Sequence, residues 1–478
     1  MHFSRKSYIG LARTSRHHRH SIADRFSFGG PQIRCHLHVR ADTSPMPLGV
    51  SRTPLLLSTT PCFRGQQLFH TLPALRSTSM PSTAELAKSS TVDVNMRQEP
   101  ASSSWVGAEG AAAFDFRSDT MTTPTPAMLS AIQTATLLDD VFEEDPTTIG
   151  LEAHVAALTG KEAGLLVLSG TMGNQIALRS LLTQPPHSVL SDHRSHIIRY
   201  EAGGVASLSG AMVSAVVPAN GKYLTLEDVK TNVVLSDNVH ACPTRVISLE
   251  NTLNGLIMPL EEVKHISAFA RAHDIKMHCD GARLWECVAS GAGSLQDFCE
   301  YFDTVSLCFS KGLGAPVGSI VVGSKGVIKH GRWIRKAIGG GLRQSGVVTA
   351  AARVAVDVTF GKGMLGEGGL LEDSHATARR VEKLWTDLGG KMALPVETNM
   401  CWLDLESMNC SASRFEELGR AAGLKLMGNR LITHYQIGEE AIRRLRSVFD
   451  KVAQEKGAGV DPEGSNGSGP YGSSKSSE

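Results

Sequence analysis

The stretch that decides the fold reads His278-Cys-Asp-Gly-Ala-Arg-Leu-Trp285 and continues, after a spacer, as Ser306-Leu-Cys-Phe-Ser-Lys-Gly-Leu-Gly314. Each half begins as a short apolar strand, and the first strand delivers Asp280 while the second delivers Lys311. The chain between them is long enough for one strand-helix-strand crossover, which joins parallel strands. The sequence therefore predicts an acid and a lysine at neighbouring strand ends.

Such a pair suits one cofactor, pyridoxal 5'-phosphate. This cofactor needs a lysine amine to hold it covalently and a carboxylate to keep its pyridine nitrogen protonated. An Asp or a Lys taken alone is more often an ordinary surface residue. Arg283 shortly after Asp280 and the glycines after Lys311 favour a cofactor site for the pair.

Composition narrows the classes of protein that this chain can represent. Its 478 residues carry a net charge of +1, which gives no reason to expect nucleic acid or an anionic membrane as a partner. No apolar run reaches the roughly 18 residues that a membrane span needs. The nine cysteines show no C-x-x-C spacing, so we expect reduced thiols and neither a disulfide framework nor a structural zinc site.

The chain divides into four parts by composition. Residues 1–112 are rich in Arg and Ser and poor in acids, which is typical of a transit peptide and predicts import into mitochondria. The alternative is a disordered leader without an address, and a start at Met46 or Met80 would leave a cytoplasmic enzyme. We expect a large domain at 113–355, a smaller α+β domain at 356–454 and a disordered tail at 455–478.

Apolar strands alternate with helical patterns through the large domain, which predicts an α/β fold with a mostly parallel sheet. Ligands of such sheets lie beyond the carboxyl ends of the strands. There the turn Ser169-Gly-Thr-Met-Gly-Asn174 precedes a helix expected at 175–182, an arrangement that suits a phosphate. Arg343 on a glycine-rich loop is a second phosphate candidate. Either His193 or His196 has the right ring to lie on an aromatic cofactor.

Several motifs in one order resemble the threonine aldolase family, whose members are aspartate-aminotransferase-like, fold type I enzymes. The resemblance spans about residues 116–449. Its anchors are Arg-Ser-Asp-Thr (117–120), Glu-Asp-Pro-Thr (144–147), Ser-Gly-Thr-Met-Gly-Asn (169–174), Tyr-Glu-Ala-Gly-Gly (200–204), Leu-Glu-Asn-Thr (249–252), His-Cys-Asp-Gly-Ala-Arg-Leu (278–284), Ser-Lys-Gly-Leu-Gly-Ala-Pro-Val-Gly (310–318), Gly-Gly-Gly-Leu-Arg-Gln (339–344) and Arg-Leu-Ile-Thr-His (430–434).

The resemblance implies a role for each site residue. Lys311 holds pyridoxal 5'-phosphate, Asp280 pairs with its pyridine nitrogen and His196 stacks on its ring. The phosphate is received by Gly170, Thr171 and Arg343, and the substrate carboxylate by Ser118, Arg283 and Arg430. His196, or a water that it positions, is the candidate base, and no residue is expected to bind a metal.

The implied reaction is the cleavage of L-threonine or L-allo-threonine to glycine and acetaldehyde. The resemblance also implies a homo-oligomer, the tetramer that is typical of the family. One departure concerns Leu253, which stands where many bacterial relatives have a histidine near the substrate hydroxyl. We therefore expect weak discrimination between the two diastereomers.

Three alternative functions remain open. They are an alanine racemase or β-eliminating lyase on the same scaffold, a non-catalytic cofactor-binding protein, and a folate-dependent hydroxymethyl transfer, for which the sequence offers no folate site.

Overall fold

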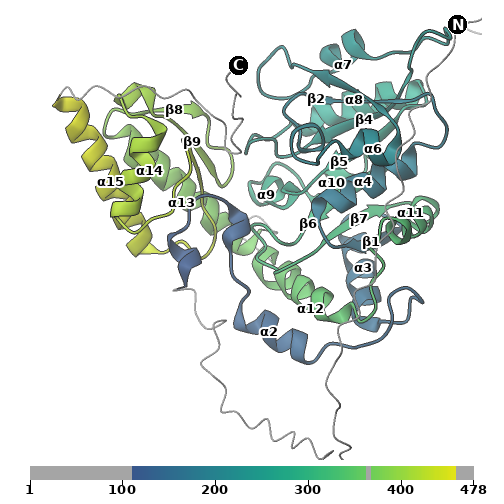
Figure 1. The fold of residues 1–478 in the computed structure, drawn as a ribbon, viewed down its shortest axis with the longest axis horizontal. Helices are drawn as coiled ribbons and strands as arrows, with labels where there is room; N and C mark the ends of the chain where they lie inside the picture. Colours follow the sequence, from purple (N-terminus) through teal and green to yellow (C-terminus); the bar gives the residue numbers. More distant parts are fainter. Residues whose placement is uncertain (1–109, 362–367, 459–478) are drawn as a thin grey trace, which may run out of the picture. The chain divides into compact units, whose positions relative to one another are not determined.

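A computed structural model describes residues 110–361 and 368–458 (Figure 1). The predicted leader at 1–112 and tail at 455–478 lie almost wholly outside these residues, and so does the prediction of mitochondrial import. Within the described residues no helix combines the length and the apolar character needed to cross a membrane. The seven cysteines in this part of the chain are free thiols, and all of them except Cys242 are buried.

The main sheet has seven strands in the order β1-β7-β6-β5-β4-β2-β3. Strands β2 to β6 pair in parallel, whereas β7 lies antiparallel between β6 and β1. This arrangement confirms the predicted α/β class with a mostly parallel sheet. The strands are β1 (Ala163–Val167), β2 (Ser188–Asp192), β3 (Met212–Val216), β4 (Thr244–Glu250), β5 (Lys276–Asp280), β6 (Thr304–Cys308) and β7 (Ser319–Gly323).

Helices follow the strands because apolar residues at helical spacing alternate with turn residues along the chain. In α8, for example, Val263, Ile266 and Ala270 are buried on one face. The helices of this part are α2 (Pro126–Gln133), α3 (Pro146–Leu158), α4 (Gly170–Leu181), α5 (His196–Arg199), α6 (Gly204–Ser209), α7 (Leu226–Asn232), α8 (Leu260–Ala272), α9 (Leu284–Ala289), α10 (Leu295–Cys299), α11 (Lys325–Ala337) and α12 (Gly346–Val354).

Helix α4 begins five residues earlier than the sequence predicts, at Gly170 rather than Gln175. Two glycines in this stretch suggested a turn, since glycine is a poor helix former. Two features outweigh that preference. Ser169 caps the helix by accepting a hydrogen bond from the Met172 amide at 3.1 Å. Gly173 is buried so tightly that a Cβ there would lie 2.5 Å from Ser306 Oγ.

A second, smaller sheet forms after residue 368, with the antiparallel strand order β10-β9-β8. Figure 1 shows α13, α14 and α15 beside its strands. Its elements are α13 (Gly369–Thr386), β8 (Lys391–Leu394), β9 (Met400–Asp404), α14 (Ala412–Ala421), β10 (Arg430–Ile432) and α15 (Glu439–Gly457). The core beneath them includes Trp385 and Phe449, whose rings meet edge to face at 5.0 Å.

The segment around Phe116 also joins this smaller core, although the sequence assigns it to the large domain. Its backbone pairs on two sides, because the Phe116 amide donates to Lys425 and the Ile432 amide donates to the Phe116 carbonyl. The short helix η2 (Asp119–Met121) follows directly. Residues of the smaller part and of the amino-terminal segment therefore come together near Ser118. The predicted domain limits stay a prediction.

Candidate active site

Asp280 and Lys311 lie at the same edge of the main sheet. Strands β5 and β6 are parallel neighbours, with Asp280 paired to Ser306. Asp280 is the last residue of β5, and Lys311 follows β6 by three residues, while α9 and α10 make the crossover between them. The predicted neighbouring strand ends are therefore present. This is the carboxyl edge of the parallel strands, where sheets of this kind bind ligands.

The Asp280 carboxylate is buried and held in one orientation. Its Oδ2 accepts a hydrogen bond from Asn174 Nδ2 at 2.7 Å, and its Oδ1 accepts one from the Ala282 amide at 3.1 Å. The Asn174 carbonyl oxygen lies 3.1 Å from Nε2 of His278. Burial lowers the pKa of His278 to about 4, so this ring is neutral at neutral pH and donates to Asn174. Asn174 and His278 were quoted in motifs, but their roles were not predicted.

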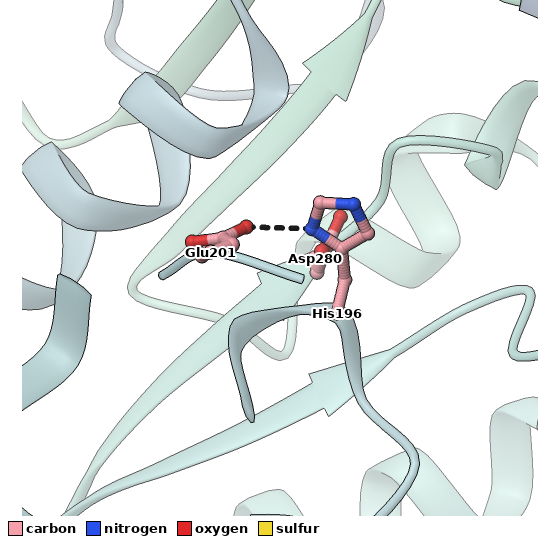
Figure 2. A group of neighbouring side chains, drawn as sticks. All are labelled: His196, Glu201 and Asp280. Carbon is pink, nitrogen blue, oxygen red and sulfur yellow. Dashed lines mark hydrogen bonds and ion pairs between the residues drawn. The ribbon is translucent and has the colours of Figure 1, made fainter. Parts of the chain in front are cut away.

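His196 is the histidine that points at this edge (Figure 2). Its Nδ1 lies 2.8 Å from Oε1 of Glu201, a buried carboxylate that also accepts from Asn174 and Gln175. One side-chain atom from each of His196, Glu201 and Asp280 lies within 4.8 Å of the others. Because a carboxylate accepts, His196 donates through Nδ1 and presents Nε2 to the site.

The pKa of His196 reflects these neighbours. Burial disfavours the charged ring, but the hydrogen bond to Glu201 and the charge of Asp280 outweigh burial and raise the pKa of His196. His193, the other candidate, lies beside Asp192 instead, at 3.3 Å. The structure thus separates two histidines that the residues alone left equivalent.

Acidic side chains gather at this edge. Besides Asp280 and Glu201, Glu250 is half-buried at the end of β4 and accepts from the His196 amide at 2.7 Å. Burial, followed by the charge of Asp280, raises the pKa of Glu250 to about 8. A protonated pyridine nitrogen would supply positive charge that this group of acids favours. The residues present therefore fit pyridoxal 5'-phosphate, and Asp280 would be the partner of its ring nitrogen.

The first turn of α4 suits the phosphate of that cofactor. Gly170 and Thr171 are half-buried and open to solvent at the helix N-terminus, where amides lack intrahelical acceptors. A Cβ on Gly170 would meet only Ser319 Oγ, at 3.9 Å. Arg343, the third phosphate candidate, turns elsewhere: its exposed guanidinium donates to Asp139 at 2.9 Å. Its phosphate role stays a prediction.

The three carboxylate candidates gather around the segment 117–119. Arg283 forms two hydrogen bonds with the buried Asp119, from Nε at 2.8 Å and from Nη2 at 2.5 Å. Ser118 caps η2 by accepting from the Thr120 amide. Arg430 donates to the Arg117 carbonyl at 3.1 Å. Asp119 was quoted in a motif without a role, and it is the residue that holds Arg283.

Comparison with known proteins identifies the family of this chain. Residues 115–407 match the family model described as beta-eliminating lyase. The aldolase vrtJ of Penicillium aethiopicum is 58% identical over 343 residues, which cover 72% of this chain and 87% of that protein. The low-specificity L-threonine aldolase of Candida albicans is 46% identical over 339 residues, or 70% and 88% of the two chains.

Two further similar proteins are a relative with a different name and a solved structure. The alanine racemase TOXG of Cochliobolus carbonum is 46% identical over 346 residues, covering 72% of this chain and 89% of that protein. A solved threonine aldolase from Leishmania major has a TM-score of 0.61 at 18% identity, covering 71% of this chain and 99% of that one. At that identity the likeness concerns the fold alone.

The fold and the site define a lyase of fold type I that depends on pyridoxal phosphate. More closely, the chain belongs to the beta-eliminating lyase family, and within it to the relatives that include the fungal low-specificity threonine aldolases. The resemblance drawn from its motifs is confirmed.

Proposed function

We propose that this chain cleaves L-threonine and L-allo-threonine to glycine and acetaldehyde. The observation that carries the proposal is the placement of Asp280 and Lys311 at the ends of two neighbouring parallel strands. Relatives that are named low-specificity L-threonine aldolases support the choice of substrate. When bound, pyridoxal phosphate supplies an electron sink for the charge left on the glycine carbon after bond cleavage.

Lys311 and Asp280 are the residues proposed to hold the cofactor. The Lys311 amine binds it covalently, and Asp280 keeps a proton on the pyridine nitrogen. Asn174 and the Ala282 amide fix the direction of the Asp280 carboxylate before any ligand arrives. Such preorganisation lets the charge act without reorganising during the reaction. The amides of Gly170 and Thr171 receive the phosphate.

Arg283, Ser118 and Arg430 are proposed to bind the substrate carboxylate. Asp119 engages Nε and Nη2 of Arg283, so Nη1 is the nitrogen proposed to meet the ligand. A clamped carboxylate restricts how the bond between Cα and Cβ can turn, and such orientation lowers the barrier.

His196 is proposed to take the proton of the β-hydroxyl at Nε2. Glu201 holds the proton on Nδ1 and thereby stabilises the ring after it has accepted a second proton. A base of this kind contributes typically about 10²–10⁴-fold to the rate. The base could also act through one water molecule, and both forms need the same contact with Glu201.

Alanine racemisation is the second candidate function, because a relative with 46% identity is named an alanine racemase. The same residues would hold the carboxylate and the cofactor, but the proton removed would be that on Cα. The two functions differ in their products, so a single preparation can separate them.

The test uses the full chain loaded with pyridoxal phosphate. L-Threonine is added with alcohol dehydrogenase and NADH, which consume acetaldehyde, and L-alanine is added to a parallel sample analysed on a chiral column. We expect NADH consumption that disappears in Lys311→Ala and persists in Lys276→Ala, an exposed lysine at the opposite end of β5. D-Alanine without acetaldehyde would replace the proposal by the racemase function. If neither acetaldehyde nor D-alanine forms, both candidate functions are refuted.

A further inference from the structure

Helix α9 follows β5 in the chain and is hydrogen-bonded to the strand that precedes Lys311. Trp285, in its first turn, is buried, and its indole N–H donates to the carbonyl of Cys308 at 3.0 Å. Cys308 is the last residue of β6. Arg283 is the N-cap of the same helix. A shift of α9 would therefore move Arg283 and disturb the strand that precedes Lys311.

Glu286 follows Trp285, and its carboxylate is buried against the lysine turn. A Cβ on Gly312, the residue after Lys311, would lie 2.2 Å from Glu286 Oε1. The other oxygen, Oε2, lies 2.8 Å from Nε2 of His375 on α13. Both side chains are almost completely buried, at 2% and 1% exposure. The glycine after Lys311 is thus required by the carboxylate that packs on it.

Asn399 links the same carboxylate to the arginine. Its Nδ2 lies 3.3 Å from Oε1 of Glu286 and 3.4 Å from Oδ2 of Asp119, the partner of Arg283. The Thr433 carbonyl accepts from the same nitrogen at 3.2 Å. A continuous polar connection therefore runs from α13 to Arg283, through residues far apart in the sequence.

A carboxylate in this position is costly, since burial penalises its charge and apolar side chains would fill the same space more cheaply. Burial raises the pKa of Glu286 in spite of the opposing effect of His375. The carboxylate packs on Gly312, and an apolar side chain in its place could not form the hydrogen bonds with His375 and Asn399. Buried polar groups of this type fix one arrangement where several would pack.

We propose that Glu286 is a positioning residue of the active site. Held by His375, its carboxylate sets the turn at Lys311–Gly312 and, through Asn399 and Asp119, the direction of Arg283. This inference rests on the proposed function for the roles of Lys311 and Arg283. Glu286 and His375 act by positioning Lys311 and Arg283 and do not contact the substrate themselves.

The test compares His375→Leu, which removes the donor, with His375→Gln, whose amide nitrogen reaches a similar place. His187→Leu is the matched control, because His187 is another buried histidine, at 5% exposure, with Nε2 3.1 Å from the Ser209 carbonyl. It precedes β2, at the strand end opposite the site. Glu286→Gln keeps the shape of the carboxylate and serves as a second variant if His375→Leu does not fold.

The first readout is hydrogen exchange in the cofactor-free, full-length protein. We expect amides of the peptide spanning 306–316 to exchange about tenfold faster in His375→Leu, because local opening of the turn becomes easier. His375→Gln should restore slow exchange, and His187→Leu should leave this peptide unchanged. Equal exchange in the wild type and His375→Leu, or in Glu286→Gln where that variant replaces it, would overturn the proposal.

The second readout is kinetic and uses the loaded enzyme. A displaced Arg283 weakens binding of the substrate carboxylate, so KM for L-threonine should rise about tenfold, and kcat/KM should fall up to about 100-fold if the lysine also moves. A fall in kcat with KM unchanged would contradict the link to Arg283. Should the wild type prove inactive on threonine, the proposed function fails, whereas the exchange experiment still decides the positioning role.

Discussion

Replacing Asp119 by Asn tests how Arg283 is held. The two side chains share two hydrogen bonds, of 2.8 and 2.5 Å, with Asp119 fully buried and the Arg283 side chain 15% exposed. Two unit charges about 4 Å apart attract by about 4 kcal/mol at an effective dielectric constant of about 20. Removing one partner of a buried pair typically costs about 3–5 kcal/mol. Because asparagine retains one acceptor, we expect the lower end, about 3 kcal/mol of unfolding free energy.

The assay is urea unfolding of the cofactor-free protein at neutral pH, carried out as a double-mutant cycle with Arg283→Gln. The two substitutions share one interaction, so their effects should fall short of additivity by about 1.5 kcal/mol or more. Asp139→Asn is the matched control, since Asp139 pairs with the exposed Arg343 and solvent screens that contact. Additive effects, or an unfolding free energy within about 0.5 kcal/mol of the wild type, would refute the reasoning.

The pH dependence of this effect has a definite sign. Burial alone would raise the pKa of Asp119, but Arg283 outweighs it and holds that pKa well below its usual value. A depressed carboxyl pKa contributes stability that is fully present above the unfolded-state pKa of about 4 and is lost as the pH falls. The difference between the wild type and Asp119→Asn should therefore shrink in acid.

Three further predictions concern other parts of the site. Leu253 is buried and cannot bond to a substrate hydroxyl, so kcat/KM for L-threonine and L-allo-threonine should differ by less than about 100-fold, or about 2.7 kcal/mol, in parallel coupled assays. A larger ratio would show that another group reads that hydroxyl. Glu201→Gln removes a contact that raises the pKa of His196, so the acid limb of the pH–rate profile should move to lower pH; an unmoved limb would exclude His196 as the group it reports. Gly173→Ala places a Cβ 2.5 Å from Ser306 Oγ and should lower the unfolding free energy by about 1–3 kcal/mol, measured in urea, whereas unchanged stability would mean that the serine moves away freely.

Local patterns in the sequence predicted the two strands that position the site well. The strands that end at Asp280 and before Lys311 are β5 and β6, because apolar residues that alternate with polar ones are typical of strands. The sequence analysis missed the beginning of α4 because its glycines disfavour a helix. The cap at Ser169 and the close packing of Gly173 outweigh that local preference. The contact between Gly173 and Ser306 that favours the helix joins residues from different elements and leaves no local signal.

Side-chain partners were the part that the sequence could not supply. Asp119 and Glu201 lie within the family motifs. Nothing in the spacing of these motifs indicates that Asp119 holds Arg283 or that Glu201 holds His196. The pair of Glu286 and His375 joins α9 to α13, and only the packed fold brings these two residues together. Asp139, the partner of Arg343, likewise lies far from it in the sequence.

The central claim is that Lys311 holds pyridoxal phosphate beside Asp280, and the most direct measurement identifies the modified residue. The full chain is loaded with the cofactor, reduced with borohydride, digested and analysed by mass spectrometry. We predict a phosphopyridoxyl group on the peptide that carries Lys311, no such group in Lys311→Ala, and wild-type labelling in Lys276→Ala. Labelling of a different lysine, or none in the wild type, would contradict the account.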